Sequence, residues 1–179
     1  MTFSNPAGHA AAAASGYVRV LLDLLGSREP IDVLQELLPW LRGRLGQVDD
    51  ATLRRPERPG KWSVVEVVQH LADSELVMGF RIRMVIASDR PALQGYDQDR
   101  WVSELRYREV PLGTALHQLA GLREGNLALA RTLTPAQLER IGRHSERGEE
   151  SIALMLRLMA GHDLVHRRQM DRILEVAAR

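Results

Sequence analysis

The sequence predicts an all-α protein built as a four-helix bundle, with a short extra helix at its N-terminus. Four segments carry leucine-rich apolar stripes at helical spacing, near residues 31–47, 63–88, 111–132 and 151–177. Helix start and stop signals flank these segments. Aromatic residues make up only 4% of the 179 residues, so residue types that favour strands are few. We interpret residues 1–179 as a single domain in which residues 1–29 form an N-terminal extension.

The first two helices are recognised by their ends. A short amphipathic helix covers Tyr17 to Leu25, with a start as early as Ala10, and Gly26 is a typical stop signal. Pro30 then stands near the first turn of the first long helix, a position that proline favours. The extension therefore ends where the bundle begins.

The second long helix has the clearest start in the chain. Ser63 is followed three residues later by Glu66, which is the pattern of a capping box. After this helix, residues 89–110 show no helical periodicity and hold three aromatic residues, Tyr96, Trp101 and Tyr107. We interpret this segment as an irregular loop, and a loop of about 20 residues in a compact domain is often functional.

The starts of the third and fourth long helices and the segment between them can also be read from the sequence. Pro111 opens the third, and Thr134 with Pro135 caps a short helical turn after it. Residues 144–150 are polar and are interpreted as a connection without regular structure. The last helix begins at Ser151 and carries an apolar stripe that includes two histidines.

Composition excludes several classes of function. The net charge of +1 does not suggest a nucleic-acid-binding tail, and no apolar run approaches the roughly 18–20 residues of a membrane helix. The chain has no cysteine, which excludes disulfides, thiolate metal sites and cysteine nucleophiles. No signal-peptide pattern is found at the N-terminus. We therefore expect a cytoplasmic protein that acts on a small molecule and binds neither nucleic acid nor membrane.

His162 and His166 are the most informative pair in the sequence. They lie four residues apart on the apolar stripe of the last helix. Residues at this spacing share one helix face, so the two imidazoles can bind one metal ion. The same spacing also fits two histidines that are hydrogen-bonded in the core or lie at its edge. A catalytic metal site of this type usually has three protein ligands, so a third is needed.

A third histidine completes a pattern that extends over most of the chain. The run Trp62-Ser63-x-x-Glu66-x-x-x-His70-Leu71-x-Asp73 is followed about 90 residues later by Gly161-His162-Asp163-x-x-His166. Together with the Pro59-to-Ser63 entry to the second long helix, this order and spacing resemble the DinB/YfiT superfamily.

The resemblance carries expectations about fold and cofactor. It implies a four-helix bundle of up-down-down-up topology that often forms a homodimer. It also implies one divalent metal ion, zinc or nickel, bound by His70, His162 and His166. By itself, His70 lies at the edge of its apolar stripe and would more often be a half-exposed histidine.

Relatives of this kind perform more than one reaction. Characterised relatives include S-transferases that use bacillithiol or mycothiol as the thiol, and an isomerase that uses mycothiol. Other relatives are named hydrolases from site resemblance alone. We expect a metal-dependent thiol S-transferase, with a metal-dependent hydrolase or a non-catalytic metal-binding stress-response protein as alternatives. A metal ion lowers the pKa of either a bound water or a bound thiol, so the ligand set fits both reactions.

Other polar and aromatic residues are candidates for the surroundings of the metal. Tyr96 and Trp101 form either a substrate wall or a hydrophobic clasp over the end of the bundle. His144 lies either in a solvated turn or in the cleft. Asp73, three residues after His70, or Asp163, next to His162, could orient a ligand imidazole through its second ring nitrogen. Asp163 is expected to form a surface ion pair with Arg167, because adjacent helix positions do not face each other.

Overall fold

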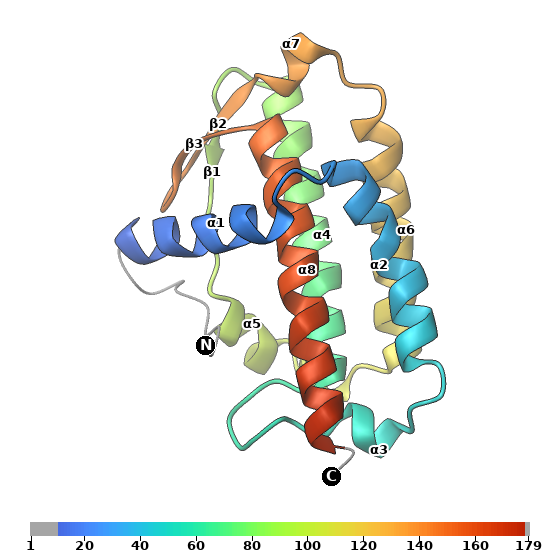
Figure 1. The fold of residues 1–179 in the computed structure, drawn as a ribbon. Coiled ribbons are helices and arrows are strands. Elements are labelled where there is room, and N and C mark those ends of the chain that lie inside the picture. The colour runs from blue at the N-terminus through green and yellow to red at the C-terminus, as the bar shows by residue number, and fades with distance from the viewer. Residues whose placement is uncertain (1–10, 178–179) are drawn as a thin grey trace.

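Four long helices form the bundle in the computed structural model, which describes residues 11–177 (Figure 1). They are α2 (Pro30–Leu45), α4 (Val64–Ala87), α6 (Leu112–Ala130) and α8 (Ile152–Ala177). Each bound lies within two residues of the predicted one. The extra helix α1 (Ala11–Leu25) precedes the bundle, and residues 1–10 of the predicted extension lie outside the described part. The prediction of the fold class is confirmed.

The bundle has the up-down-down-up topology. Helices α2 and α8 run in one direction, while α4 and α6 run in the other (Figure 1). Packing is closest between the two parallel pairs, α4 with α6 and α2 with α8, and α4 also packs on α8. Parallel neighbours that follow each other in sequence need a connection that returns along the whole bundle. Residues 88–111 provide it, which explains why this bundle contains so long a connection.

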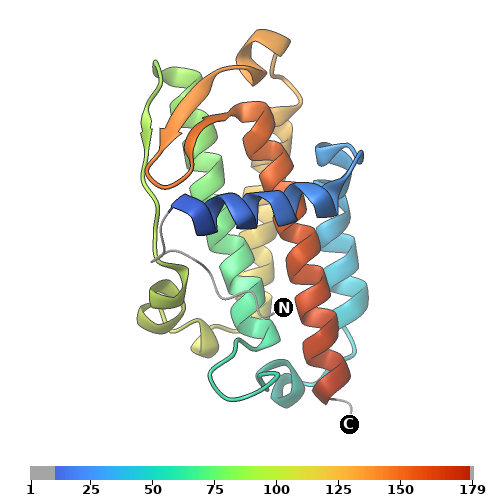
Figure 2. The same cartoon turned by 60° about the vertical axis from the view of Figure 1, so that its left-hand side comes forward.

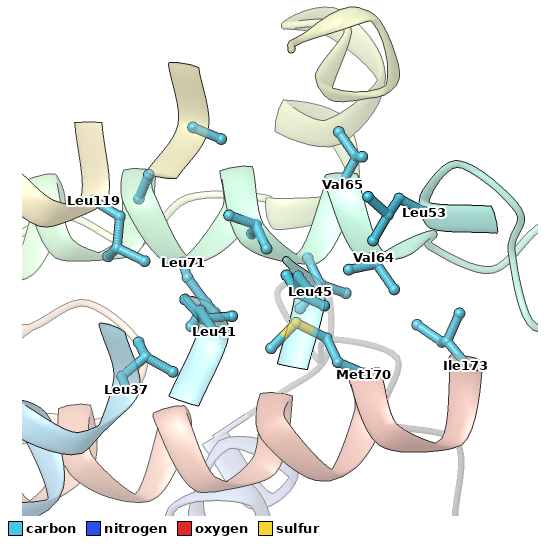
Figure 3. Close-up of a cluster of buried hydrophobic side chains, with 14 of the residues drawn as sticks. Leu37, Leu41, Leu45, Leu53, Val64, Val65, Leu71, Leu119, Met170 and Ile173 are labelled. Carbon is cyan, nitrogen blue, oxygen red and sulfur yellow. The ribbon is translucent and has the colours of Figure 1, made fainter. Parts of the chain in front are cut away.

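The apolar stripes meet in two large clusters separated along the bundle axis, and a third, smaller cluster joins Leu21 of α1 to Leu158 and Val165 of α8. Figure 3 shows the first, in which leucines of α2 pack against valines of α4 and against Met170 and Ile173 of α8. The second cluster lies toward the start of α8 and the end of α4, and includes Ile82 and Met155. On α8, the segment 161–166 falls between the two clusters. A functional site in this segment would therefore rest on packed core at both ends.

Local signals fix the ends of the helices as the sequence predicts. The Ser63 hydroxyl caps α4, and the Ser63 N–H donates to Glu66 Oε2 at 2.7 Å. Gly26 adopts a φ of +60° after α1, which a residue with a Cβ rarely does. Thr134 and Gln137 form a second capping box at the short helix α7 (Pro135–Leu138). Another short helix, α3 (Asp50–Leu53), follows α2.

Two segments that were expected to be irregular are ordered. Residues 144–150 belong to a hairpin of β2 (Ile141–His144) and β3 (Gly148–Ser151), joined in parallel by β1 (Ala92–Leu93). The register pairs Leu93 with His144. The long connection also contains α5 (Gln98–Glu104) and the 3-10 turn Tyr107–Glu109. The interpretation of both segments as irregular was wrong, because strands of two to four residues are too short to show alternation.

Helix α1 lies across the bundle rather than along it, over α8 (Figures 1 and 2). The crossing depends on Gly161 of α8, because a Cβ at this position would lie 2.4 Å from the backbone oxygen of Leu21. The backbones of the two helices therefore approach each other as only glycine permits. Within residues 11–177, no helix is both long and apolar enough to cross a membrane.

Replacing Gly161 by alanine should lower the free energy of unfolding by about 1–3 kcal/mol, because α1 must move away from α8. Gly125 is the matched control, since it lies in α6 and a methyl group added there would meet no atom within 4 Å. Gly125→Ala should stabilise the protein by about 0.5–1 kcal/mol through helix propensity. Urea denaturation measures both. Equal effects of the two substitutions would show that the α1–α8 approach contributes no constraint.

Candidate metal centre

Three histidine side chains converge at the middle of the bundle. His70 comes from α4, while His162 and His166 come from successive turns of α8. The Nε2 atom of His162 lies 3.1 Å from Nε2 of His70 and 3.0 Å from Nε2 of His166. One ligand atom from each histidine lies within 4.8 Å of the other two. The structure thus brings together the three residues that the sequence proposes as ligands, and His70 is buried rather than half-exposed.

Direct hydrogen bonds do not satisfy these three nitrogens. His162 Nε2 faces both of the other Nε2 atoms, but a neutral imidazole nitrogen carries at most one proton. With one proton or one lone pair, His162 Nε2 can make a well-directed hydrogen bond to only one of its two neighbours, and the other close nitrogen is left without a good partner. A cation between the three nitrogens removes this conflict. Zinc–nitrogen bonds of about 2.0–2.1 Å in a tetrahedral site place two ligand nitrogens roughly 3.3 Å apart, close to the observed separations.

Burial keeps the three imidazoles neutral. It lowers the pKa of His166 to about 4, and it lowers the pKa of His70 well below the usual value, an effect to which His166 adds. The pKa of His162 is also well below its usual value, first through burial and then through the two other histidines. A neutral imidazole offers the lone pair that a metal requires. The site is therefore ready to bind a cation at neutral pH without first losing protons.

Neighbouring side chains hold the ligand rings in place. His166 Nδ1 lies 2.7 Å from Gln169 Oε1, so Nδ1 carries the proton and Nε2 keeps its lone pair. The Trp62 ring, just before α4, packs against His70 and His166 with centroid separations of 4.9 and 6.4 Å. Asp73, the residue expected to orient His70, instead accepts hydrogen bonds from Tyr107, Gln69 and Gln118. That expectation was wrong.

Replacing Gln169 by leucine should weaken metal binding about 10-fold to 100-fold, because the His166 ring loses the acceptor that fixes its tautomer. Competition of the purified protein with a metal-binding dye measures this affinity. Gln169→Glu keeps an acceptor and should retain most of the binding. Leucine and glutamate variants of equal affinity would show that Gln169 does not orient the ligand.

Asp163 does not form the expected surface ion pair with Arg167. It is buried, and its two oxygens bind Arg123 of α6 at 2.7 and 3.1 Å. Arg123 also binds Glu75 of α4 at 2.9 Å. Burial alone would lower the pKa of Arg123, but the two carboxylates raise it above its usual value. The ion-pair prediction was wrong because α6 approaches α8 at this point, and a local helical pattern does not contain that information.

His162 opens onto a pocket between α1, α4, α8 and the β2–β3 hairpin. The pocket has a volume of about 100 Å³, and its lining includes Tyr17, Tyr96, His144 and Arg81. His144 is buried in this lining rather than in a solvated turn. Trp101 does not line the pocket, but its ring packs on Tyr96 with a centroid separation of 4.3 Å. Of the three residues suggested for substrate contact, two line this pocket and the third supports one of them.

Ser74 is a lining residue that was not among the candidates predicted from the sequence. Its hydroxyl lies 3.4 Å from His70 Nε2 and 3.2 Å from the Tyr96 hydroxyl. The hydroxyl groups of Ser74 and Tyr96 therefore lie next to each other beside the histidine cluster. The available signal was the spacing, because Ser74 lies four residues after His70 and so shares its helix face.

Comparison with known proteins agrees with the fold, and the names of the relatives describe metal-dependent proteins. The model of the DinB superfamily matches residues 34–170. A protein of Oceanobacillus iheyensis named "Putative metal-dependent hydrolase" is 28% identical over 143 residues, which cover 74% of this chain and 82% of the relative. A protein of Bacillus cereus with the same name is 28% identical over 76% of this chain and 78% of its own.

A solved structure is also similar. YfiT from Bacillus subtilis, described as a probable metal-dependent hydrolase with an unusual four-helix bundle topology, superposes with a TM-score of 0.74. It is 28% identical in sequence, and the match covers 83% of this chain and 84% of YfiT. The helix order of the two proteins is therefore shared over most of their length.

Proposed function

This chain belongs to the DinB superfamily, and we propose that it is a metal-dependent enzyme that acts on a small molecule in the pocket beside His162. The observation that carries the proposal is the convergence of three neutral imidazole nitrogens at the wall of that pocket. An all-nitrogen ligand set suits zinc or nickel better than magnesium or calcium, which prefer oxygen. When bound, such an ion acts as a Lewis acid that lowers the pKa of a thiol or a water.

The residues around the cluster divide into those that bind a metal and those that face a substrate. His70 and His166 are buried, and His162 is the histidine that lines the pocket. Ser74 and Tyr96 lie on the same side, and burial raises the pKa of Tyr96. The phenol therefore stays protonated at neutral pH and can donate a hydrogen bond to a developing negative charge.

We favour S-transfer from a low-molecular-weight thiol as the reaction. Hydrolysis benefits from a free carboxylate as general base. Of the pocket's carboxylates, Glu75 and Asp163 are both bound to Arg123, and Glu146 acts on the charge of Arg81. A thiol activated by a cation needs no such base. Its sulfur would lose its proton to water and form a bond to an electrophilic carbon, while the bond from that carbon to the leaving group breaks and the group departs with the electron pair. The Tyr96 hydroxyl would donate a hydrogen bond to the departing group.

Hydrolysis is the second candidate, favoured by the names of the relatives. It would use the same three histidines with a water in place of the thiol. The two reactions differ in one requirement, because only S-transfer consumes a thiol. The cytoplasmic location, the homodimer and the lack of nucleic-acid binding stay predictions.

Conjugation of a chloronitrobenzene electrophile by the metal-loaded protein tests the reaction. We expect product with bacillithiol or mycothiol, none without thiol, and none after chelation until metal is restored. Trp101→Ala should mainly raise KM, because Trp101 supports Tyr96 rather than the metal ligands. Ester or amide cleavage without thiol would replace this proposal by the hydrolase. Absence of turnover with a broad set of electrophiles and esters would refute both and leave a metal-binding protein.

A further inference from the structure

The pocket also contains a polar end formed by Arg81, His144 and Arg147. Arg81 projects from α4, His144 ends β2, and Arg147 lies in the turn of the hairpin. Neither Arg81 nor His144 belongs to the cluster of His70, His162 and His166. Both are buried, with exposed fractions of 5% and 4%. Buried polar groups are normally satisfied by partners, so their hydrogen bonds indicate what this end of the pocket is built to hold.

Arg81 is a buried cation without a carboxylate partner. One of its nitrogens donates to the Gln94 carbonyl and another lies 3.5 Å from the sulfur of Met78. Among residues 11–177, no ion pair includes Arg81. Burial lowers the pKa of Arg81 and the nearby Arg147 adds to the effect, whereas the charges of Glu150 and Glu146 act in the opposite direction. A guanidinium keeps its proton in proteins, so Arg81 remains a buried cation that has carboxylates nearby but no direct ion pair with them.

His144 supplies a second unmet donor. Its Nδ1 accepts a hydrogen bond from the Glu146 N–H at 3.1 Å, so in the neutral ring the proton is on Nε2. Burial lowers the pKa of His144 to about 4, with Arg147 and Arg81 adding to the effect, so the ring is neutral at physiological pH. The Nε2 atom is buried and has no hydrogen-bond partner within the described residues. A buried N–H without an acceptor is costly.

The other charged groups of the pocket do not balance Arg81 directly. Arg147 is bound to Glu150, and Arg123 is bound to Glu75 and Asp163. Glu146 forms no ion pair among the described residues, but its charge acts on Arg81 from a distance. The lining also contains two tyrosines, Tyr17 and Tyr96. Burial raises the pKa of each phenol, so neither supplies a negative charge at neutral pH. This end of the pocket therefore offers a guanidinium without a direct ion pair and an imidazole N–H without an acceptor, with Glu146 and Glu150 as the nearby negative charges.

We propose that Arg81 and His144 bind the carboxylate of an organic acid whose other end reaches His162. This inference rests on the proposed function, because it names the substrate class of the same pocket. A guanidinium and an imidazole N–H that line the same pocket can each donate to one oxygen of a carboxylate. The lining of the same pocket also includes five apolar side chains, those of Val18, Leu21, Met78, Leu158 and Met159. A short hydrocarbon segment would therefore link the carboxylate to the reactive group.

Calorimetric titration with matched probes tests the proposal. The probes are hexanoate, the uncharged hexanamide and hexyl phosphate, each added to metal-loaded protein and to protein treated with a chelator. Hexanoate should bind at least about tenfold more tightly than hexanamide in both forms, because a charge-assisted hydrogen bond is lost with the amide. Tighter binding of hexyl phosphate than of hexanoate would replace the carboxylate by a phosphate monoester as the preferred anion.

Variants separate the two donors from the metal. Arg81→Met should weaken hexanoate binding about tenfold or more, and Arg81→Lys should weaken it less. His144→Asn keeps an acceptor for the Glu146 N–H but lacks the Nε2 donor, whereas His144→Gln places an amide N–H near that position. Asparagine should therefore weaken binding more than glutamine. Arg143→Met is the charge control, because Arg143 is exposed on the same strand and should leave binding unchanged.

The outcomes distinguish this inference from the proposed function. Equal affinities for hexanoate and hexanamide, or hexanoate binding that disappears on chelation and is unaffected by Arg81→Met, would overturn the anion site. Absence of turnover with hexanoate binding intact would overturn only the enzymatic proposal. If circular dichroism shows that Arg81→Met does not fold, the comparison of the two His144 variants decides the question.

Discussion

Replacing Arg123 by methionine should lower the free energy of unfolding by about 3–5 kcal/mol, which would make it among the most damaging substitutions in the chain. Arg123 is buried in α6 and binds Glu75 of α4, Asp163 of α8 and the Leu34 carbonyl of α2. Its removal leaves two carboxylates in the core without a cation. The side chain also connects all four helices of the bundle, so no single neighbour can replace it.

Urea denaturation followed by circular dichroism measures the loss. Arg131→Met is the matched control, because Arg131 follows the same helix and is exposed. Surface substitutions of this kind change the free energy of unfolding by less than about 0.5 kcal/mol. A loss of less than about 1 kcal/mol for Arg123→Met would mean that Glu75 and Asp163 become neutral or solvated at little cost, contrary to their burial.

The helices could be predicted from the sequence because their signals are local. The apolar stripes, the Ser63–Glu66 capping box and Gly26 each act within a few residues, and each fixes a helix or its end. The three histidines could be placed together because the motif spacing resembles a known superfamily. The local pattern of the last helix alone fits metal ligands and hydrogen-bonded core histidines equally well at positions His162 and His166.

The remaining features depend on contacts between distant segments. Asp163 pairs with Arg123 across 40 residues, and β1 joins β2 across about 50 residues. Nothing near Asp163 in the sequence indicates which helix will face it. His144 likewise becomes buried only because the hairpin folds against the pocket. Pairings of this kind follow from the packing of the bundle and not from the periodicity of any single element.

Removing any one of the three histidines should abolish metal-dependent behaviour. Two imidazoles bind a divalent ion much more weakly than three, so the affinity should fall by more than about 100-fold. Metal that binds only the folded state stabilises it by about 2.7 kcal/mol at 100 times its dissociation constant. Chelation should therefore lower the melting temperature of the wild type and leave that of His70→Ala, His162→Ala and His166→Ala unchanged. Activity should disappear in the same three variants.

The metal content of the purified protein is the most direct test of the three-histidine centre. Elemental analysis should find one divalent metal ion per chain in the wild type and almost none in the alanine variants of His70, His162 and His166. His117→Ala is the control and should keep the metal, because His117 is exposed on α6 and its Nδ1 lies 2.9 Å from the Gly113 carbonyl. Equal metal content in the wild type and in all three ligand variants would contradict the account.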